Sequence, residues 1–482
     1  MLFHSIDFAI FLPVVFILYW FVARKPLALQ NLLIVAASYV FYGWWDPRFL
    51  ALIFLSTLVD YSVGRKLATA HNQGKRKLLL WTSILVNLGC LGFFKYCDFF
   101  IENFTAAFSF FGQDIQGASL KIVLPVGISF YTLQTLSYTI DVYRRTVKPT
   151  NDFIAFSAFV SFFPQLVAGP IERATQLLPQ FYKPRTFDYA LAVDGMRQVL
   201  WGLFKKIVIA DNCAEFANLI FNNSAYMNGS ALILGALFFA FQIYADFSGY
   251  SDIAIGTSRL FGFSLMRNFN FPYFSRSIAE FWRRWHISLS TWFRDYVYIP
   301  LGGSRGGTLR TVCNVFIIFI VSGFWHGANW TFVIWGALNA IYFLPSLLTK
   351  SNRNHIDVVA QGKYVPTATE LLMMLSTFGL TLLAWIFFRA ENVSHAFSYI
   401  NGILSPSLFE TPNFAGLDRA WVALSLVAIF LLIEWFGREQ QFAIQRLGLQ
   451  WKRPLRYAAY YAMITAILWF SGKEQDFIYF QF

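Results

Sequence analysis

Two histidines are candidate chemical groups in this sequence, and the first is His326. It lies in SGFWHGANWTFVIWG (322–336), between two apolar runs that are each long enough to enter a membrane. Ionisable side chains at membrane depth are costly and usually face the interior of a helix bundle. Imidazole is also the side chain best able to act as a base near neutral pH. We therefore interpret His326 as a catalytic candidate, the alternative being a histidine that hydrogen-bonds a neighbouring helix.

The residues around His326 limit what such a site could do. Gly323 and Gly327 flank it, and a glycine lets either backbone or a ligand approach closely. We expect these glycines to leave room for two reactants to meet at the imidazole. The nearby tryptophans are expected to be packing groups and interface anchors, because indole is favoured at membrane–water interfaces.

The second histidine, His286, lies forty positions earlier in FWRRWHISLS. Trp282 precedes it by four residues and would stack on its ring if this stretch is helical. One interpretation makes His286 a polar group at the cytoplasmic mouth of a cavity, where it would help to position a substrate. The other makes it a histidine that snorkels at the membrane interface, and the spacing alone favours this second interpretation.

Basic side chains near these histidines are candidate binding groups for an anion. Arg283 and Arg284 precede His286, Arg294 follows it, and Arg305 lies in the glycine-rich LGGSRGG (301–307). Backbone amides in such a loop meet phosphate, and guanidinium adds bidentate donors. The G-K-[ST] end of a Walker A sequence is missing. The four arginines therefore predict weak binding of an anionic cytoplasmic group such as a coenzyme A thioester, and a solvated basic loop fits nearly as well.

Polar residues inside an apolar run form a further candidate group. Gln242, Tyr244 and Asp246 stand close together in QIYADFSGYSD, and Asn329 follows His326 by three residues. We expect these four side chains to line a cavity, where they could relay a proton or orient an acceptor hydroxyl. The alternative is a buried network that ties helices together.

The composition shows which elements must position these groups. Hydrophobic residues make up 57% of the 482 residues and charged residues 13%, whereas soluble domains carry about 25% charged residues. Apolar runs long enough to cross a bilayer recur along almost the whole chain, and the mean hydropathy is +0.50. We expect an all-α polytopic membrane protein with about 11–13 transmembrane or re-entrant helices. The expected segments are 4–22, 30–45, 48–64, 78–95, 122–141, 152–169, 191–210, 230–262, 311–325, 328–348, 368–388, 420–436 and 456–471.

Two kinds of local pattern modify these segments. Helix breakers interrupt some apolar runs, and a broken helix at membrane depth needs protein or a water-filled cavity around it. The breakers are Pro125, Gly127, Pro164, Gly169 and Pro170. The stretch 265–310 is rich in arginine and aromatic residues but not apolar enough to span. It predicts short interfacial helices, about 275–285 and 286–298, followed by a glycine-rich turn.

The charge pattern predicts topology rather than a nucleic-acid partner. The net charge is +12, and basic residues of membrane proteins collect in cytoplasmic loops. Clusters such as Arg24/Lys25, Lys75–Lys77 and Lys350/Arg353 alternate with poorly basic turns such as 112–119, which places the N-terminus outside and the tail 473–482 outside. The four cysteines have no zinc-ligand or disulfide spacing. We therefore expect no metal and no nucleic acid.

Several longer motifs together resemble a known family. They run in the family's order from about residue 38 to 482: SYVFYGWWDPRFL, LPVGISFYTLQTLSYTIDVYRR, FFPQLVAGPIERA, YADFSGYSDIAIGTSRLFGF, NFNFPYFSRSIAEFWRRWHISLSTWFRDYVYIPLGGSR, SGFWHGANWTFVIWG and FIYFQF. With these motifs the chain resembles the membrane-bound O-acyltransferases (MBOAT), in particular the bacterial branch typified by the membrane subunit of alginate O-acetyltransferase (AlgI-like). It is less closely similar to the D-alanyl transferases of teichoic acids.

The resemblance implies a fold and assigns roles to both histidines. It implies one domain over 1–482, a ring of helices around a central funnel that thins the membrane. Within it, 1–120 would be peripheral helices, 121–390 the catalytic core and 391–482 C-terminal helices. His326 matches the family's active-site histidine, and His286 matches its second characteristic polar position.

The resemblance also implies a reaction and its participants. Acetyl-CoA would be the cytoplasmic donor, no cofactor would be bound permanently, and His326 would act as base or as transient acyl acceptor. An exported polysaccharide such as alginate would be the final acceptor, reached through periplasmic or membrane-anchored partner proteins at the inner membrane. The alternatives are an ion-coupled transporter or channel, or a family member that acts on a lipid or protein. The membrane lipid itself is the remaining partner.

Overall fold

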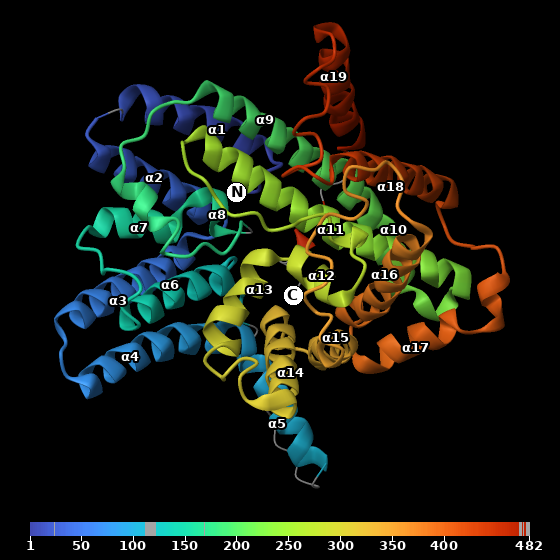
Figure 1. Cartoon of the computed structure of the whole chain (residues 1–482), viewed down its shortest axis with the longest axis horizontal. Helices are drawn as coiled ribbons and strands as arrows, with labels where there is room; N and C mark the ends of the chain where they lie inside the picture. Colours follow the sequence, from blue (N-terminus) through green and yellow to red (C-terminus); the bar gives the residue numbers. More distant parts are fainter. Residues whose placement is uncertain (24, 111–121, 168, 472–474, 476, 479–482) are drawn as a thin grey trace. The chain divides into compact units, whose positions relative to one another are not determined.

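The chain is built from helices, and the part that the structure describes contains no strand. The computed structural model (Figure 1) describes residues 1–23, 25–110, 122–167, 169–471, 475, 477 and 478. Arg24, the predicted turn 112–119 and most of the tail 473–482 lie outside the described residues, as do the last four residues of FIYFQF. The predicted all-α class is confirmed.

The first compact unit comprises Met1–Ala192 and Thr257–Met266. Its helices are α1 (Ile6–Ile17), η1 (Leu18–Val22), α2 (Leu27–Gly43), η2 (Pro47–Phe49), α3 (Leu50–Thr69), α4 (Gln73–Leu91), η3 (Gly92–Tyr96), α5 (Cys97–Phe110), α6 (Ile128–Tyr143), α7 (Phe153–Ser161), α8 (Phe163–Leu166) and η4 (Leu178–Tyr182). Helices α3, α4 and α6 pack against one another, and α2 packs against α7 (Figure 1). Helix α9 (Tyr189–Leu203) begins in this unit.

A buried polar network joins three helices of the first unit. The Asp60 carboxylate on α3 accepts hydrogen bonds from Ser83 and Asn87 on α4, and from Thr139 on α6. Buried polar groups are stable in a low-dielectric interior only when they are hydrogen-bonded. The network therefore fixes how these three apolar helices pack, which apolar side chains alone do weakly in lipid.

The predicted helix breaks are present. Gly127 has a φ of 75°, a left-handed conformation that glycine adopts without strain, and α6 begins directly after it. Helix α7 ends at Ser161, and the four-residue α8 contains Pro164 near its start. The apolar runs 122–141 and 152–169 are therefore interrupted rather than continuous helices.

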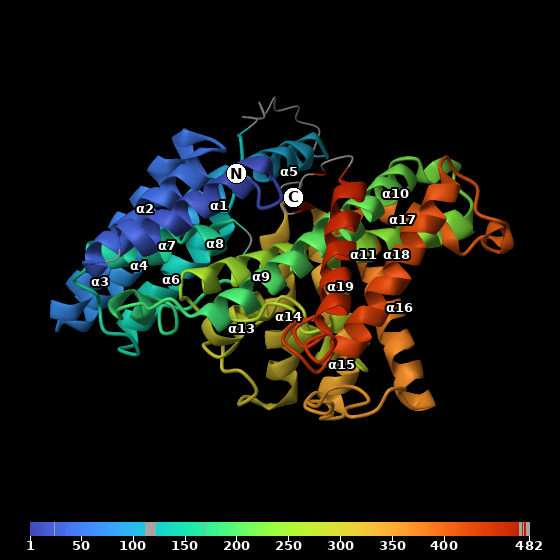
Figure 2. The same ribbon diagram turned by 90° about the horizontal axis from the view of Figure 1, so that it is seen from above.

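The second compact unit comprises Val193–Gly256 and Arg267–Phe482. Its elements are the rest of α9, η5 (Phe204–Ala210), α10 (Asp211–Asn222), η6 (Ser224–Tyr226), α11 (Gly229–Leu260), η7 (Pro272–Phe274), α12 (Ile278–Arg284), α13 (Ile287–Phe293), η8 (Arg294–Tyr298), α14 (Gly307–His326), α15 (Trp330–Leu348), α16 (Ala368–Arg389), α17 (Val393–Ile403), η9 (Pro406–Phe409), α18 (Leu417–Gly437) and α19 (Arg453–Phe470). Figure 2 shows α16, α18 and α19 from a second side. The predicted interfacial helices correspond to α12 and to α13 with η8.

Seven helices in the described residues are long and apolar enough to cross a membrane. They begin at Pro47, Gln73, Gly229, Gly307, Trp330, Ala368 and Leu417. Two shorter apolar helices, Ile6–Val22 and Leu27–Gly43, accompany them. The chain is therefore a polytopic membrane protein, with the interrupted runs of the first unit in addition to its long helices.

Candidate functional site

His326 is the last residue of α14, and the next residues explain why the helix ends there. Gly327 has extended backbone, and the Asn329 side chain accepts a hydrogen bond from the Thr331 amide at the start of α15. An asparagine in this position caps a helix N-terminus. The sequence HGAN thus forms the tight connection between two antiparallel helices, and it leaves the imidazole at their junction with 4% of its surface exposed.

The glycines beside His326 serve helix packing. A Cβ on Gly323 would lie 2.2 Å from the carbonyl oxygen of Phe332 on α15, and one on Gly336 would lie 2.3 Å from the oxygen of Phe319 on α14. A Cβ on Gly327 would lie 2.1 Å from the Phe332 ring. The predicted space for two reactants at Gly323 and Gly327 is therefore wrong, because protein atoms fill it. The glycines instead let the backbones of α14 and α15 approach closely, and the two helices lie side by side (Figures 1 and 2).

His286 lies in a turn rather than in a helix. Helix α12 ends at Arg284, and His286 follows with φ 42° and ψ 55° before α13 begins. Stacking of Trp282 on the His286 ring, four residues later, needs a continuous helix, and the chain is not helical at His286. Instead the Phe247 ring of α11 meets the imidazole edge to face at 4.6 Å between centroids. Snorkelling is also wrong for His286, because its side chain is only 1% exposed.

The two histidines lie together although forty residues separate them in sequence. Their ring centroids are 6.4 Å apart. Trp325, Trp335 and Phe388 surround the imidazole of His326 at centroid distances of 5.0, 5.2 and 5.4 Å. Burial lowers the pKa of His286 to about 3, since desolvation disfavours the charged imidazolium. The pair thus occupies an aromatic, water-poor site in which His286 is neutral at physiological pH.

A cavity of about 530 Å³ opens beside this site. Its walls come from α12, α13, η8, α14, α15 and the loop that follows α15. The inner part is apolar, with side chains such as Phe319 and Phe343, and the polar part carries Arg283, Arg294 and Arg353. Such a mixed cavity fits a ligand that has an apolar or neutral arm and an anionic head.

The cavity comes within one helical turn of His326. Ser322 lines it, four residues before His326 on α14. Trp282 lines it as well, and its ring packs on Trp335 at 5.7 Å, while Trp335 in turn contacts His326. The Trp282 indole donates to the Asn339 amide oxygen at 3.2 Å, which fixes its orientation. Trp282 and Trp335 therefore form the wall between the cavity and the imidazole.

The four arginines that are predicted to bind an anion have different surroundings. Arg305 is exposed in the turn before α14. Arg283 lines the cavity, yet its guanidinium already donates to the carbonyls of Asn352, Asn354 and His355. Arg284 is buried and points to Glu280 at 2.7 Å. Of the four, Arg283 and Arg294 lie at the cavity, and Arg353 joins them there.

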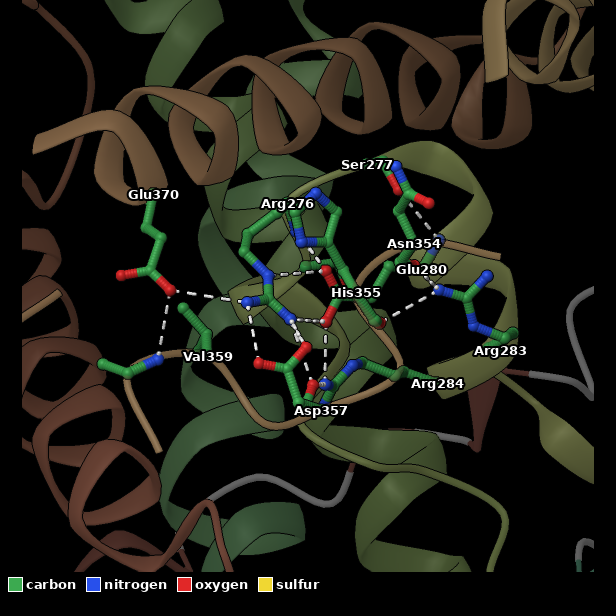
Figure 3. A network of polar contacts seen from close by, with 12 residues as sticks. Arg276, Ser277, Glu280, Arg283, Arg284, Asn354, His355, Asp357, Val359 and Glu370 are labelled. Carbon is green, nitrogen blue, oxygen red and sulfur yellow. Dashed lines mark hydrogen bonds and ion pairs between the residues drawn. The ribbon is translucent and has the colours of Figure 1, made fainter. Parts of the chain in front are cut away.

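A charged network surrounds Glu280, which is 0% exposed (Figure 3). Arg276 and Arg284, at the two i±4 positions, both donate to its carboxylate. Arg276 also reaches Asp357 at 3.1 Å and Glu370 at 3.4 Å (Figure 3). A buried carboxylate between two guanidiniums has its charge compensated. The network connects α12, α16 and the loop after α15, so it holds that wall of the cavity in place.

Arginines hold the loop 352–363 through its main chain. Arg283 donates to three carbonyls at its start, and both Arg276 and Arg284 donate to the carbonyl of Asp357. Arg438 on the other side donates to the carbonyls of Val359, Ala360 and Lys363. The loop has no regular hydrogen bonding of its own, and these charged donors replace it.

The predicted cavity-lining residues lie mostly in buried networks. Asp246 pairs with the Lys206 ammonium at 2.9 Å and accepts from the Ile478 amide. Tyr244 donates to Glu434 at 2.8 Å and borders a small polar void of about 10 Å³. Gln242 is buried, and Asn329 is the cap described above. The alternative of polar networks that tie helices together describes Asp246 and Tyr244 better.

Several residues at the site were not predicted from the sequence. Arg353 lines the cavity, and Glu280 supports its wall. The spacing Arg276–Glu280–Arg284 was a readable signal, because residues four apart share a helix face. No local pattern marks Arg353, which reaches the cavity from a loop. Among the described residues, no group of three or more His, Cys, Asp and Glu side chains is placed to hold a metal ion.

Comparison with known proteins shows the family to which the chain belongs. The model of the MBOAT, membrane-bound O-acyltransferase family, matches residues 148–387, which include both histidines. The chain is 40% identical over 438 residues to "Probable alginate O-acetylase AlgI" of Pseudomonas aeruginosa, covering 89% of this chain and 80% of the relative. It is 37% identical over 423 residues to "Peptidoglycan O-acetyltransferase" of Helicobacter pylori, covering 82% and 78%.

A more distant similarity extends to a third polymer. The chain is 28% identical over 291 residues to "Teichoic acid D-alanyltransferase" of Bacillus subtilis, covering 56% of this chain and 70% of the relative. These relatives are named as transferases that act on polymers, which decides against a transporter or channel. The chain therefore belongs to the membrane-bound O-acyltransferase family, and it is a multi-pass membrane acyltransferase.

Proposed function

We propose that the protein is an O-acetyltransferase of the bacterial inner membrane. It takes acetyl from acetyl-CoA at the cytoplasmic side and passes it outward for O-acetylation of an exported polysaccharide such as alginate. Periplasmic or membrane-anchored acetyltransferase proteins complete the transfer. The relatives named for alginate and peptidoglycan acetylation support this choice of group and acceptor class.

One observation carries the proposal. His286 and His326 share a buried aromatic site, with centroids 6.4 Å apart, one helical turn from a cavity that suits a thioester donor. The phosphates of the donor would meet Arg294 and Arg353, whose guanidiniums suit phosphate oxygens. The pantetheine arm would extend along the apolar inner wall, past Trp282, and bring the thioester to His326.

The histidines then carry out the transfer. His326 takes the proton of an acceptor hydroxyl as that oxygen attacks the thioester carbonyl carbon. The carbon–sulfur bond breaks, and the departing thiolate recovers the proton from the imidazolium. Alternatively, a ring nitrogen of His326 attacks the thioester carbon, the carbon–sulfur bond breaks and the thiolate leaves; the acceptor hydroxyl then attacks the acetyl group, loses its proton and displaces the imidazole. His286, neutral in its dry surroundings, orients the acceptor or relays the proton.

The test measures acetyl transfer from labelled acetyl-CoA in membranes that contain the full chain. We expect His326→Ala to lose about 10²–10⁴-fold in rate, because base catalysis contributes about that much. His71→Ala is the matched control, since His71 is exposed on the first unit. Unchanged transfer in folded His326→Ala would overturn the catalytic assignment. A rapid quench with denaturant at neutral pH, followed at once by mass spectrometry, decides between base and acyl carrier, because only the carrier leaves acetyl on His326.

The acceptor is tested in the producing cell. Loss of acetyl esters from an envelope polysaccharide in a deletion strain, restored by the wild-type chain but not by His326→Ala, supports a polymer acceptor. Acetyl esters lost from a lipid or a protein, with polysaccharide esters unchanged, would instead favour the other acceptor classes of this family.

A further inference from the structure

The backbone at His286 is held in a conformation that a histidine rarely adopts. Its φ of 42° and ψ of 55° are left-handed, and the preceding Trp285 is extended. For a residue with a Cβ this conformation is strained and persists only where the surroundings enforce it. The turn it makes separates α12 from α13 and turns the imidazole towards His326. Something in the structure must therefore hold this turn.

Asn268 makes the contacts that hold it. Its carbonyl accepts from the Ile287 amide at 2.9 Å, and its side-chain Oδ1 accepts from the Ser288 amide and hydroxyl at 3.3 and 2.9 Å. The residue is 0% exposed. These bonds satisfy the first amides of α13, which is the task of an N-cap side chain. Here Asn268, eighteen positions before His286, supplies the capping side chain. The residue at the N-cap position therefore does not have to cap the helix, and it is a histidine.

A second anchor ties the same residue to α11. The Asn268 Nδ2 donates to the Ser251 hydroxyl at 3.2 Å. Ser251 lies one helical turn after Phe247, whose ring contacts the imidazole of His286. Helix α11 thus supports His286 twice, directly through Phe247 at the ring and through Asn268 at the backbone.

We propose that Asn268 is a positioning residue that holds the left-handed turn at His286 and so keeps its imidazole opposite His326. The geometric part of this proposal stands on the contacts above. The kinetic part rests on the proposed function, because it is read as acetyl transfer. Asn268 acts through the main chain of Ile287 and Ser288.

The geometry is tested without any enzyme assay. In the full chain, the two cysteines of the double variant His286→Cys/His326→Cys are joined by a short membrane-permeant bis-maleimide, and the linked peptides are quantified by mass spectrometry. We expect Asn268→Ala to lower the yield at least about fivefold, and Asn268→Asp to restore most of it, because Asp keeps the acceptor for Ser288. Asn31→Ala, a buried asparagine of the first unit, is the control. An undiminished yield in Asn268→Ala overturns the proposal.

The kinetics separate positioning from general damage. Asn268→Ala should lower kcat for acetyl transfer by roughly 10- to 100-fold and leave the KM for acetyl-CoA within about twofold. In a His286→Ala background the same change should have no further effect. Equal losses in both backgrounds indicate a purely structural role and overturn the proposal.

Two further outcomes keep this proposal distinct from the proposed function. A wild-type chain that transfers no acetyl, while the cross-linking result holds, refutes the proposed function but leaves the positioning of His286 by Asn268 intact. If Asn268→Ala does not fold, Asn268→Ser, whose hydroxyl is too short to reach Ser288, takes its place in both experiments.

Discussion

Replacing Gly323 with alanine should separate α14 from α15 and disturb the site at their junction. The added Cβ would lie 2.2 Å from the Phe332 carbonyl oxygen, whereas carbon–oxygen contacts begin at about 3.3 Å. The two helices must therefore move apart locally by about 1 Å. Overpacking of this kind costs about 1–3 kcal/mol. Because His326 follows three residues later on α14, the same movement displaces the imidazole, and a misplacement of about 1 Å can cost roughly 10²-fold in rate.

The control for this variant is Gly379→Ala. Gly379 lies inside α16, another long apolar helix, and an added Cβ there meets nothing within 4 Å. Both variants gain the same helix propensity of up to about 1 kcal/mol, so the difference between them isolates the clash. The assay is thermal unfolding of the purified chains in detergent, followed by acetyl transfer from labelled acetyl-CoA. Equal stability and equal activity of Gly323→Ala and Gly379→Ala would refute the packing role of Gly323.

Two further perturbations test the charged network and the neutral histidine. Glu280→Gln should destabilise the fold by roughly 3–5 kcal/mol, because it leaves two buried guanidiniums without their shared carboxylate. Thermal unfolding measures this loss, and the control is Glu215→Gln, whose partner arginine is exposed. Equal melting temperatures for the two variants would contradict the prediction. The pKa of His286 is lowered to about 3 in the folded chain, whereas an unfolded histidine titrates at about 6.5. Below about pH 6.5 the unfolded chain therefore binds a proton that the folded chain does not. The free energy of unfolding should then decline by up to about 1.4 kcal/mol per pH unit from about pH 6.5 towards about pH 3. Above about pH 6.5 this contribution is constant. Melting temperatures of His286→Gln should therefore fall less steeply between about pH 6.5 and 5 than those of the wild type, and parallel curves would count against a neutral buried imidazole.

The long helices were predictable because a membrane span needs about twenty apolar residues, and few other structures do. The breaks at Gly127 and Pro164 were predictable for a different reason: glycine and proline interrupt a helix through their own backbone chemistry, whatever their neighbours are. The space at Gly323 was misjudged, because a glycine permits close approach without saying what approaches. That distinction depends on Phe332, a residue of the facing helix, and only packing places it there.

The candidate site was predictable in its members but not in its assembly. His326 could be identified as a candidate because an ionisable side chain within apolar segments costs free energy. Its distance from His286 follows from the turn that Asn268 holds, and no spacing along the chain encodes that contact. Arg284 looked like a ligand for phosphate, yet it neutralises Glu280, four residues earlier on the same helix face. A basic residue near a site can bind an anionic ligand or neutralise a buried carboxylate. A carboxylate one helical turn away indicates the second role.

The arginine contacts to the loop 352–363 have a consequence for how this protein can vary. Arg276, Arg283 and Arg438 hold that loop by its carbonyl groups, which every amino acid supplies. Its path therefore depends on these partners, on the Asp357 carboxylate that pairs with Arg276 and on the buried Val359, and not on its exposed side chains. Exposed positions such as Ile356 and Gln361 could be substituted, or carry a short epitope, while the course of the loop is kept. The segment is thus a place where the chain can change its surface chemistry without changing its backbone path.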